Sequence, residues 1–295
     1  MQRCMEEKKE RPKSALKITK KYIVGEILIA AFTFSLAVFS ARKFLQIIKE
    51  QEIEIPQMPL SQFITSFLFL VLFIVLLASL PKIKKVRRAV YSFLFIAASL
   101  YGLLIILSSF LVDLWSLVLG GLLFLCWLYF RNVLFHDILM IFAIAGISVP
   151  LGLSLTPRSM IFLLLIFSIY DYIAVYKTKH MQKMAKTMMK EGVITAFFIP
   201  EKIKGLFLKT KEVKPQQGVL ILGGGDIAFP LLFTISALPV NYLMALLIAV
   251  FSFLGIIFSN FLFLFQKERS PMPALPPISL FAILGYIIAA LIIYY

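Results

Sequence analysis

The chain has 295 residues, of which 61% are hydrophobic, and its mean hydropathy is +0.94. Apolar runs of about 20 residues indicate a polytopic α-helical membrane protein, since a spanning β-barrel would show short alternating segments instead. The formal net charge of +15 comes from basic residues between these runs, which indicates membrane topology and no nucleic-acid partner. Two cysteines and two histidines predict neither a disulfide framework nor a zinc site, and we expect no metal or cofactor.

The apolar runs predict nine transmembrane helices, called spans 1 to 9. They cover residues 22–40, 62–80, 89–111, 114–130, 137–155, 159–176, 218–238, 242–265 and 278–295. The predicted regions are a basic cytosolic tail (1–21), spans 1 to 6 (22–176), a cytosolic loop (177–217) and spans 7 to 9 (218–295). Span 1 follows a basic segment, as in a signal peptide, but its length and the following Arg42 and Lys43 predict that it is retained.

Nine spans place the two termini on opposite sides of the membrane. With the N-terminus in the cytosol, the cytosolic segments hold 26 of the 30 lysine and arginine residues. Cytosolic loops of membrane proteins are enriched in these residues. The asymmetry therefore predicts a cytosolic N-terminus and a C-terminus outside.

Two of the fifteen acidic residues, Asp171 in span 6 and Asp226 in span 7, lie within apolar runs away from the loops. An ionised Asp at bilayer depth costs at least about 2.5 kcal/mol, so such acids indicate a functional site. At 1.5 Å per helical residue, they lie about 9 Å and about 13 Å from the cytosolic boundary. Similar depths on successive spans favour a shared site, although each acid alone could be a satisfied polar residue. We expect Glu26 to snorkel or meet the basic tail, and Asp137 to suit a helix N-terminus.

The backbone around Asp226 is weakened on both sides. Three glycines, Gly223 to Gly225, precede it, and each weakens a helix by roughly 1 kcal/mol relative to alanine. Pro230 follows and leaves the carbonyl of Asp226 without its helical donor. Two nearby carboxyl groups share a proton, so one can take a proton from water while the other donates to a carbonyl oxygen, as in aspartic proteolysis. A proton or sodium site in a transporter would also use paired acids.

Three motifs occur together in this chain: Tyr170-Asp171 in span 6, Gly223-x-Gly225-Asp226 in span 7, and Pro273-Ala274-Leu275 just before span 9. In order and span number the set resembles the presenilin and signal peptide peptidase family, the GxGD-type intramembrane aspartyl proteases. The resemblance covers all nine spans and implies that Asp171 and Asp226 are the catalytic pair.

The resemblance also implies that the Pro273-Ala274-Leu275 segment lies near the acids, shapes the active site and holds substrate. The alternative for this segment is an ordinary helix-entry turn, which Pro276 and Pro277 would suit. Gly223 and Gly225 would let the backbone approach the carboxylate and a substrate strand. Tyr170 either packs against its neighbours or orients Asp171 and contacts substrate.

The details of the motifs point to a compact microbial, archaeal-type presenilin homologue. The extended motif from Gly223 to Pro230 resembles signal peptide peptidase, whereas the cytosolic N-terminus resembles presenilin. The loop 177–217 is much shorter than in animal presenilins, so the resemblance implies activity without self-cleavage in this loop.

The lysine-rich loop holds one apolar, β-prone segment, at residues 193–200, and a second segment, residues 213–222, leads directly into the glycines. A helical substrate hides its peptide bonds, so cleavage requires local unwinding. We expect the second segment to offer a strand edge to the unwound substrate. The alternative is a mobile loop with an amphipathic patch on lipid.

These inferences favour an integral, multi-pass membrane protease, in the cell membrane if the source is microbial. Its predicted partners are the lipid bilayer and single-span transmembrane proteins or peptides. A coupled secondary transporter and a non-enzymatic scaffold with a retained site are the alternatives. Small residues such as Gly120 and Gly121 allow close helix packing, within one chain or in a homo-oligomer.

Overall fold

A computed structural model describes most of the chain. It covers residues 13–52, 58–59, 61–66, 68–69, 72, 84–177, 195–210, 213, 218–265 and 272–294, and the statements below concern these residues. Predicted span 2 lies largely outside them.

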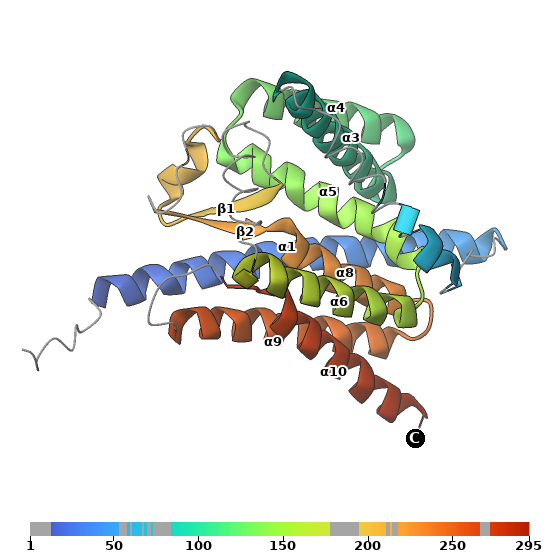
Figure 1. Cartoon of the computed structure of the whole chain (residues 1–295). Coiled ribbons are helices and arrows are strands. Elements are labelled where there is room, and N and C mark those ends of the chain that lie inside the picture. Colours follow the sequence, from blue (N-terminus) through green and yellow to red (C-terminus); the bar gives the residue numbers. More distant parts are fainter. Residues whose placement is uncertain are drawn as a thin grey trace, which may run out of the picture.

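The described residues are mostly helical (Figure 1). The α-helices are α1 (Lys13–Glu50), α3 (Lys84–Phe110), α4 (Asp113–Phe130), α5 (Val133–Ser154), α6 (Pro157–Tyr172), α8 (Gly224–Ala237), α9 (Tyr242–Phe265) and α10 (Leu275–Tyr294). The π-helix η1 (Ile173–Lys177), the 3-10 helix η2 (Ile203–Phe207) and the strands β1 (Ala196–Pro200) and β2 (Val219–Gly223) complete the fold. Six helices are long and apolar enough to cross a membrane, and α4 and α8 contain shorter apolar helices. The nine-span count and its orientation stay predictions.

Predicted span 7 is a strand followed by a helix. Residues 219–223 form β2, which pairs with β1 in antiparallel register, and α8 begins only at Gly224. The prediction of one continuous helix from residue 218 was therefore wrong, and with it the depth calculated for Asp226. Glycine has a low propensity for both strand and helix. The three glycines therefore end the strand, and they do not extend α8 toward the N-terminus. The expectation of a strand before Gly223 is confirmed.

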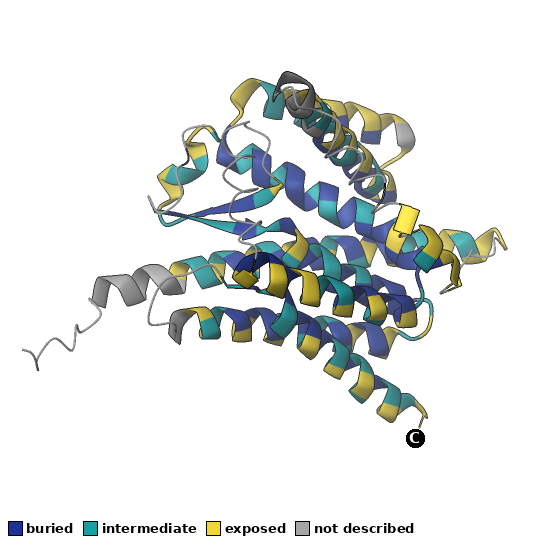
Figure 2. Ribbon diagram, in the orientation of Figure 1, coloured by how far each residue is buried: buried dark blue, intermediate teal, exposed yellow. Residues whose placement is uncertain are grey.

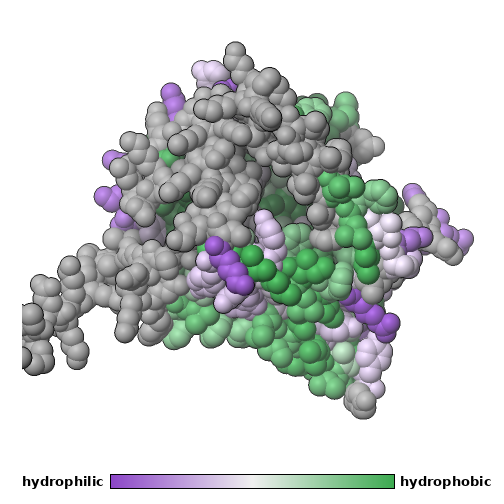
Figure 3. All heavy atoms as spheres, viewed as in Figure 1, coloured by the Kyte–Doolittle hydropathy of each residue, from purple (hydrophilic) through white to green (hydrophobic). Residues whose placement is uncertain are grey.

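Helix α8 lies at the centre of the molecule. It contacts α1, α5, α6, α9 and α10, and it continues directly from β2. Most of its residues are buried, as the dark ribbon in Figure 2 shows, and the fully buried Leu231, Phe233 and Ile235 belong to the main core. Apolar side chains also cover much of the outer face formed around α6 and α10 (Figure 3), as expected for a surface in contact with lipid. The short helix that carries Asp226 is thus enclosed by longer ones.

Helices α3 and α5 approach each other through two glycines. A Cβ atom on Gly102 would lie 2.6 Å from the Cα of Ala143, and one on Gly146 would overlap the backbone of Gly102. The two backbones are therefore in direct contact, as in the small-residue interfaces of membrane helices. The two glycines singled out in the sequence differ from each other. A Cβ on Gly120 would lie 3.3 Å from the side chain of Leu104 in α3, whereas a Cβ on Gly121 would meet nothing within 4 Å.

We predict that Gly146→Ala and Gly102→Ala each destabilise the protein, because α3 and α5 must move apart. The expected loss is about 1–3 kcal/mol, typical of overpacking. Gly121→Ala is the matched control, and it should be neutral or stabilise its helix by up to about 1 kcal/mol. Thermal unfolding in detergent measures the stability of each variant. Equal unfolding midpoints for all three variants would contradict the prediction.

Candidate active site

Asp171 lies at the C-terminal end of α6 and points to the start of α10. Helix α6 has a well-formed beginning, where the Thr156 hydroxyl accepts from the Ser159 amide and Pro157 occupies the first turn. At the other end the Asp171 side chain is buried, and its Oδ2 accepts a hydrogen bond from the Leu275 amide over 3.2 Å. The Ala274 amide also bonds this carboxyl group. Because α10 begins at Leu275, the carboxylate satisfies amides that a helix start leaves unpaired.

Asp226 lies in the first turn of α8, three residues after Gly223, which precedes the helix. Its side chain is partly buried and folds back toward that glycine: a Cβ on Gly223 would lie 3.0 Å from Oδ2. A carboxylate in this position is favoured by the helix dipole. A side chain at residue 223 would push against the acid, which explains the glycine.

The other two glycines of the motif have different surroundings. A Cβ on Gly224 would be 3.2 Å from the ends of Met140 and Ile144 of α5 and from the Thr195 carbonyl. Gly225 is exposed and would contact only the ring of Phe229, at 3.4 Å. Gly224 therefore serves packing, whereas Gly225 lies exposed next to Asp226.

An aromatic pair fixes the spacing between α6 and α8. The rings of Phe167 and Phe229 lie with their centroids 4.4 Å apart. Phe167 is one turn before Asp171 and Phe229 is one turn after Asp226, so both rings share a helix face with an acid. The carboxyl groups of Asp171 and Asp226 interact electrostatically, but no hydrogen bond joins these two described side chains. The structure thus brings the two acids near each other without direct contact.

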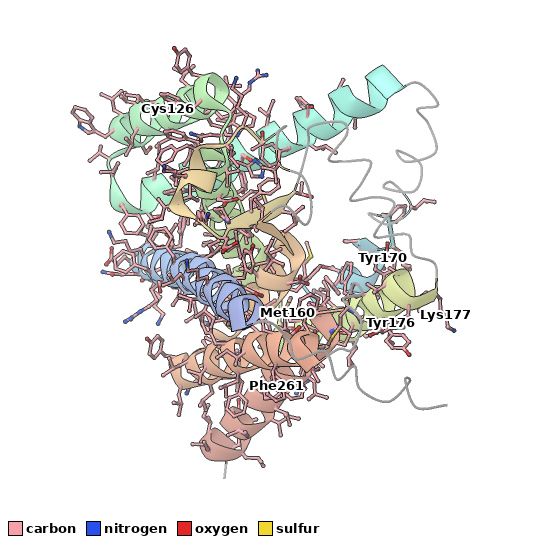
Figure 4. The ribbon with its side chains drawn as sticks, turned by 90° about the vertical axis from the view of Figure 1, so that its left-hand side faces the viewer. Cys126, Met160, Tyr170, Tyr176, Lys177 and Phe261 are labelled. Atoms are coloured by element: carbon pink, nitrogen blue, oxygen red, sulfur yellow. The ribbon has the colours of Figure 1, made fainter. Side chains whose placement is uncertain are left out.

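The structure also gathers the remaining predicted site residues around this pair. Helices α6, α8 and α10 contact one another pairwise, which brings Asp171, Asp226 and the segment Pro273, Ala274 and Leu275 together. The expected helix start at the prolines is confirmed, since Pro276 and Pro277 lie in the first turn of α10. Tyr170 lies near the end of α6 and has 54% of its surface exposed. Tyr176, in the π-helix η1 that follows α6, lies in the same region (Figure 4). The Tyr170 side chain therefore does not pack into the core.

A third intramembrane acid, Glu26 of α1, was missed as a site residue. The expectation that it snorkels or meets the tail was wrong: its side chain is buried, and Oε2 accepts a hydrogen bond from Asn260 of α9 over 2.9 Å. Glu26 also interacts electrostatically with Asp226. The sequence holds one indication that Glu26 has a partner: Asn260 is a polar residue inside predicted span 8. The two residues are 234 positions apart, so the sequence did not reveal that they pair.

Asp137 of α5 also differs from its prediction. It is buried, and its Oδ1 accepts a hydrogen bond from the Phe198 amide of β1 over 3.0 Å. Asp137 lies beyond the first turn of α5, so it does not complement the helix terminus. Its hydrogen bond goes to strand β1 instead.

Comparison with known proteins assigns most of the chain to one protein family. The family model described as signal-peptide peptidase, presenilin aspartyl protease matches residues 24–294. The chain belongs to this family. It is therefore an integral membrane protein of the aspartyl protease class, and the predicted family, enzyme class and membrane location are confirmed.

Two solved structures share the fold. Both are of a presenilin family intramembrane aspartate protease, in the C222 and P2 space groups, with TM-scores of 0.58 and 0.55. Each is 21% identical to this chain, and each match covers 91% of this chain and 97% of the other. No curated protein sequence matches the chain significantly.

We predict that Asp171→Ala exposes the start of α10, because the Leu275 amide loses its acceptor. Loss of a helix cap costs about 1 kcal/mol, so amide hydrogen exchange at residue 275 should rise roughly fivefold. Asp171→Asn keeps an oxygen acceptor and should retain most of the protection. Asp226→Ala is the control and should leave this exchange unchanged. Unaltered exchange in Asp171→Ala would show that the carboxylate does not support the helix start.

Proposed function

We propose that this protein is an intramembrane endopeptidase that hydrolyses peptide bonds within the transmembrane segments of single-span proteins. The observation that carries the proposal is the juxtaposition of Asp171 and Asp226 on packed helices, next to the start of α10. Aspartic proteolysis needs two carboxyl groups that share one proton. The family supplies the reaction class, and these two residues are its candidate machinery.

In this mechanism one carboxylate takes a proton from water as the water attacks the scissile carbonyl. The protonated carboxyl group donates to the carbonyl oxygen, and the proton taken from water later reaches the leaving nitrogen. Asp171 is held by the Leu275 amide and Asp226 rests against Gly223, so each has a fixed starting position. Binding of substrate beside exposed Gly225 would bring peptide bond, water and both acids into contact.

The charge asymmetry of the sequence supports the orientation proposed for this mechanism. With a cytosolic N-terminus, the β1–β2 sheet and the start of α8 lie toward the cytosolic side. Water then reaches the acids from the cytosol, and the substrates are single-span proteins whose N-terminus faces outside.

We predict that Asp171→Asn and Asp226→Asn each abolish cleavage, because Asn can neither accept the proton from water nor donate one as an acid. The test uses wild-type protein in liposomes with a fluorescent single-span peptide, and a transition-state-mimicking aspartyl protease inhibitor should block the signal. Asp137→Asn is the matched control, since it replaces a buried acid outside the pair with an acceptor of the same shape.

The same liposomes discriminate the transporter alternative. Inhibitor-insensitive proton or sodium flux, together with an intact peptide, would replace the protease proposal. Cleavage that persists in Asp171→Asn or Asp226→Asn would assign the chemistry to other residues.

Strand β2 is the proposed docking edge for the unwound substrate. The bond from the Glu201 amide to the Gly218 carbonyl continues the β1–β2 ladder, so the backbone groups of Leu220 and Leu222 face β1. Those of Val219 and Ile221 then face the opposite side, where no partner occurs among the described residues. A substrate strand paired there would lead directly to Gly223 and Asp226.

We predict that Ile221→Pro strongly lowers cleavage, because proline removes an amide donor from the open edge without removing one from the ladder with β1. Ile221→Ala is the control for lost packing, since it keeps the amide, and it should retain much more activity. The ratio of kcat/KM for the two variants measures the effect. Equal activities would argue against strand addition at β2.

A further inference from the structure

The first turns of α5 occupy the outer edge of β1. The Phe198 amide donates to Asp137 Oδ1 over 3.0 Å, and the Ala196 carbonyl lies 3.1 Å from His136 Nε2, which is placed to donate to it. The backbone groups of alternate residues in a strand point to opposite edges. Ala196 and Phe198 alternate with Phe197 and Ile199, whose backbone groups face β2. Two side chains of α5 therefore stand where a third strand would pair.

Burial, ring stacking and backbone hydrogen bonds hold the start of α5 against the sheet. His136 and Asp137 are both buried, and the imidazole stacks on Phe95 at a centroid distance of 5.5 Å with an interplanar angle of 9°. Asn132 caps α5 through the Phe135 amide. The first residue of α5 is tied to the segment after η2, because the Val133 amide donates to the Leu208 carbonyl. Helix α5 and the sheet are thus fixed to each other on two sides.

Because the outer edge of β1 is occupied, a substrate strand can pair only with β2. Neighbouring strands are about 4.8 Å apart, so a strand added to the outer edge of β1 would lie about 10 Å from β2, whereas a strand added to β2 would lie about 5 Å from it. Only β2 runs directly into the helix that carries Asp226. A substrate on the β1 edge would be bound away from the acids. Unpaired strand edges readily accept other chains, so a sheet with two open edges would also bind unproductively.

We propose that His136 and Asp137 are positioning residues that close the β1 edge and hold the sheet rigid, so that substrate adds to β2 alone and in one register. This inference rests on the proposed function and deepens it. The pair touches neither the substrate nor the reacting atoms. It acts through the backbone of β1, and its effect is on where and how tightly the substrate binds.

The test compares Asp137→Leu, which removes the acceptor, with Asp137→Asn, which keeps an oxygen for the Phe198 amide. Leaving the Phe198 amide without its acceptor should lower kcat/KM by about tenfold, mainly through KM, while Asp137→Asn stays near wild type. Mass spectrometry of the products should show one main cleavage position for wild type and several for Asp137→Leu. His136→Phe, which keeps the aromatic stack and loses the polar contact, should behave like Asp137→Leu.

Ser252→Ala is the matched control, because it removes a buried hydroxyl whose bond, to the Ile248 carbonyl, stays within α9. It should leave KM and cleavage position unchanged. An unchanged KM and a single cleavage position in Asp137→Leu would overturn the inference. So would an equal loss in Asp137→Asn, since the charge would then matter and not the clamp on the strand.

A binding measurement separates this inference from the proposed function. In an Asp226→Asn background, where no cleavage is expected, the affinity for the fluorescent single-span peptide should fall about tenfold on adding Asp137→Leu. That result supports edge closure whether or not the wild type cleaves. An unchanged affinity overturns edge closure even if the wild type is an active protease.

Discussion

The whole arrangement depends on one constraint: a backbone amide or carbonyl away from water must have a partner. The described chain breaks its helices at the two places where the site forms, before α8 and before α10. At the first break, β1 pairs with β2 on one side and with His136 and Asp137 on the other. At the second, Asp171 accepts from the Leu275 amide. The outer edge of β2 has no backbone partner among the described residues, and β2 runs directly into the helix that carries Asp226.

The sheet also explains why α8 can be short. Its 14 residues extend for about 21 Å, less than the roughly 30 Å of a hydrocarbon core. The preceding residues of β2 are extended and rise about 3.3 Å each, so β2 extends farther per residue than a helix would. One face of the sheet joins the main core through Phe197 and Leu222, and the other packs in a second cluster with Val133 and Phe198. A helix enclosed by five others thus begins next to the exposed Gly225.

The sequence predicted the elements that depend on local composition. Long apolar runs located the spans that coincide with α1, α3, α5, α6, α9 and α10, and the motifs around Asp171 and Asp226 identified the family. It did not predict where span 7 changes from strand to helix, because an apolar β-prone run has the same composition in either state. Nor did it predict the partners of Glu26 and Asp137, which come from residues 234 and 61 positions away. An acid in an apolar run signals a required partner, but only the fold selects which one.

Asp171 connects two parts of the candidate site that are far apart in the sequence. Its Oδ2 accepts from the Leu275 amide, so the proposed catalytic carboxyl group is attached to the segment proposed to hold substrate. Asp226 has no such link to α10 among the described residues, and its carboxyl group rests on the motif's own Gly223. A shift of α10 on substrate binding would therefore act on Asp171 directly through this hydrogen bond, and on Asp226 only through the packing of α8. Under the proposed mechanism, the distance between the two acids would then depend on substrate binding, and hydrolysis would require a correctly bound substrate.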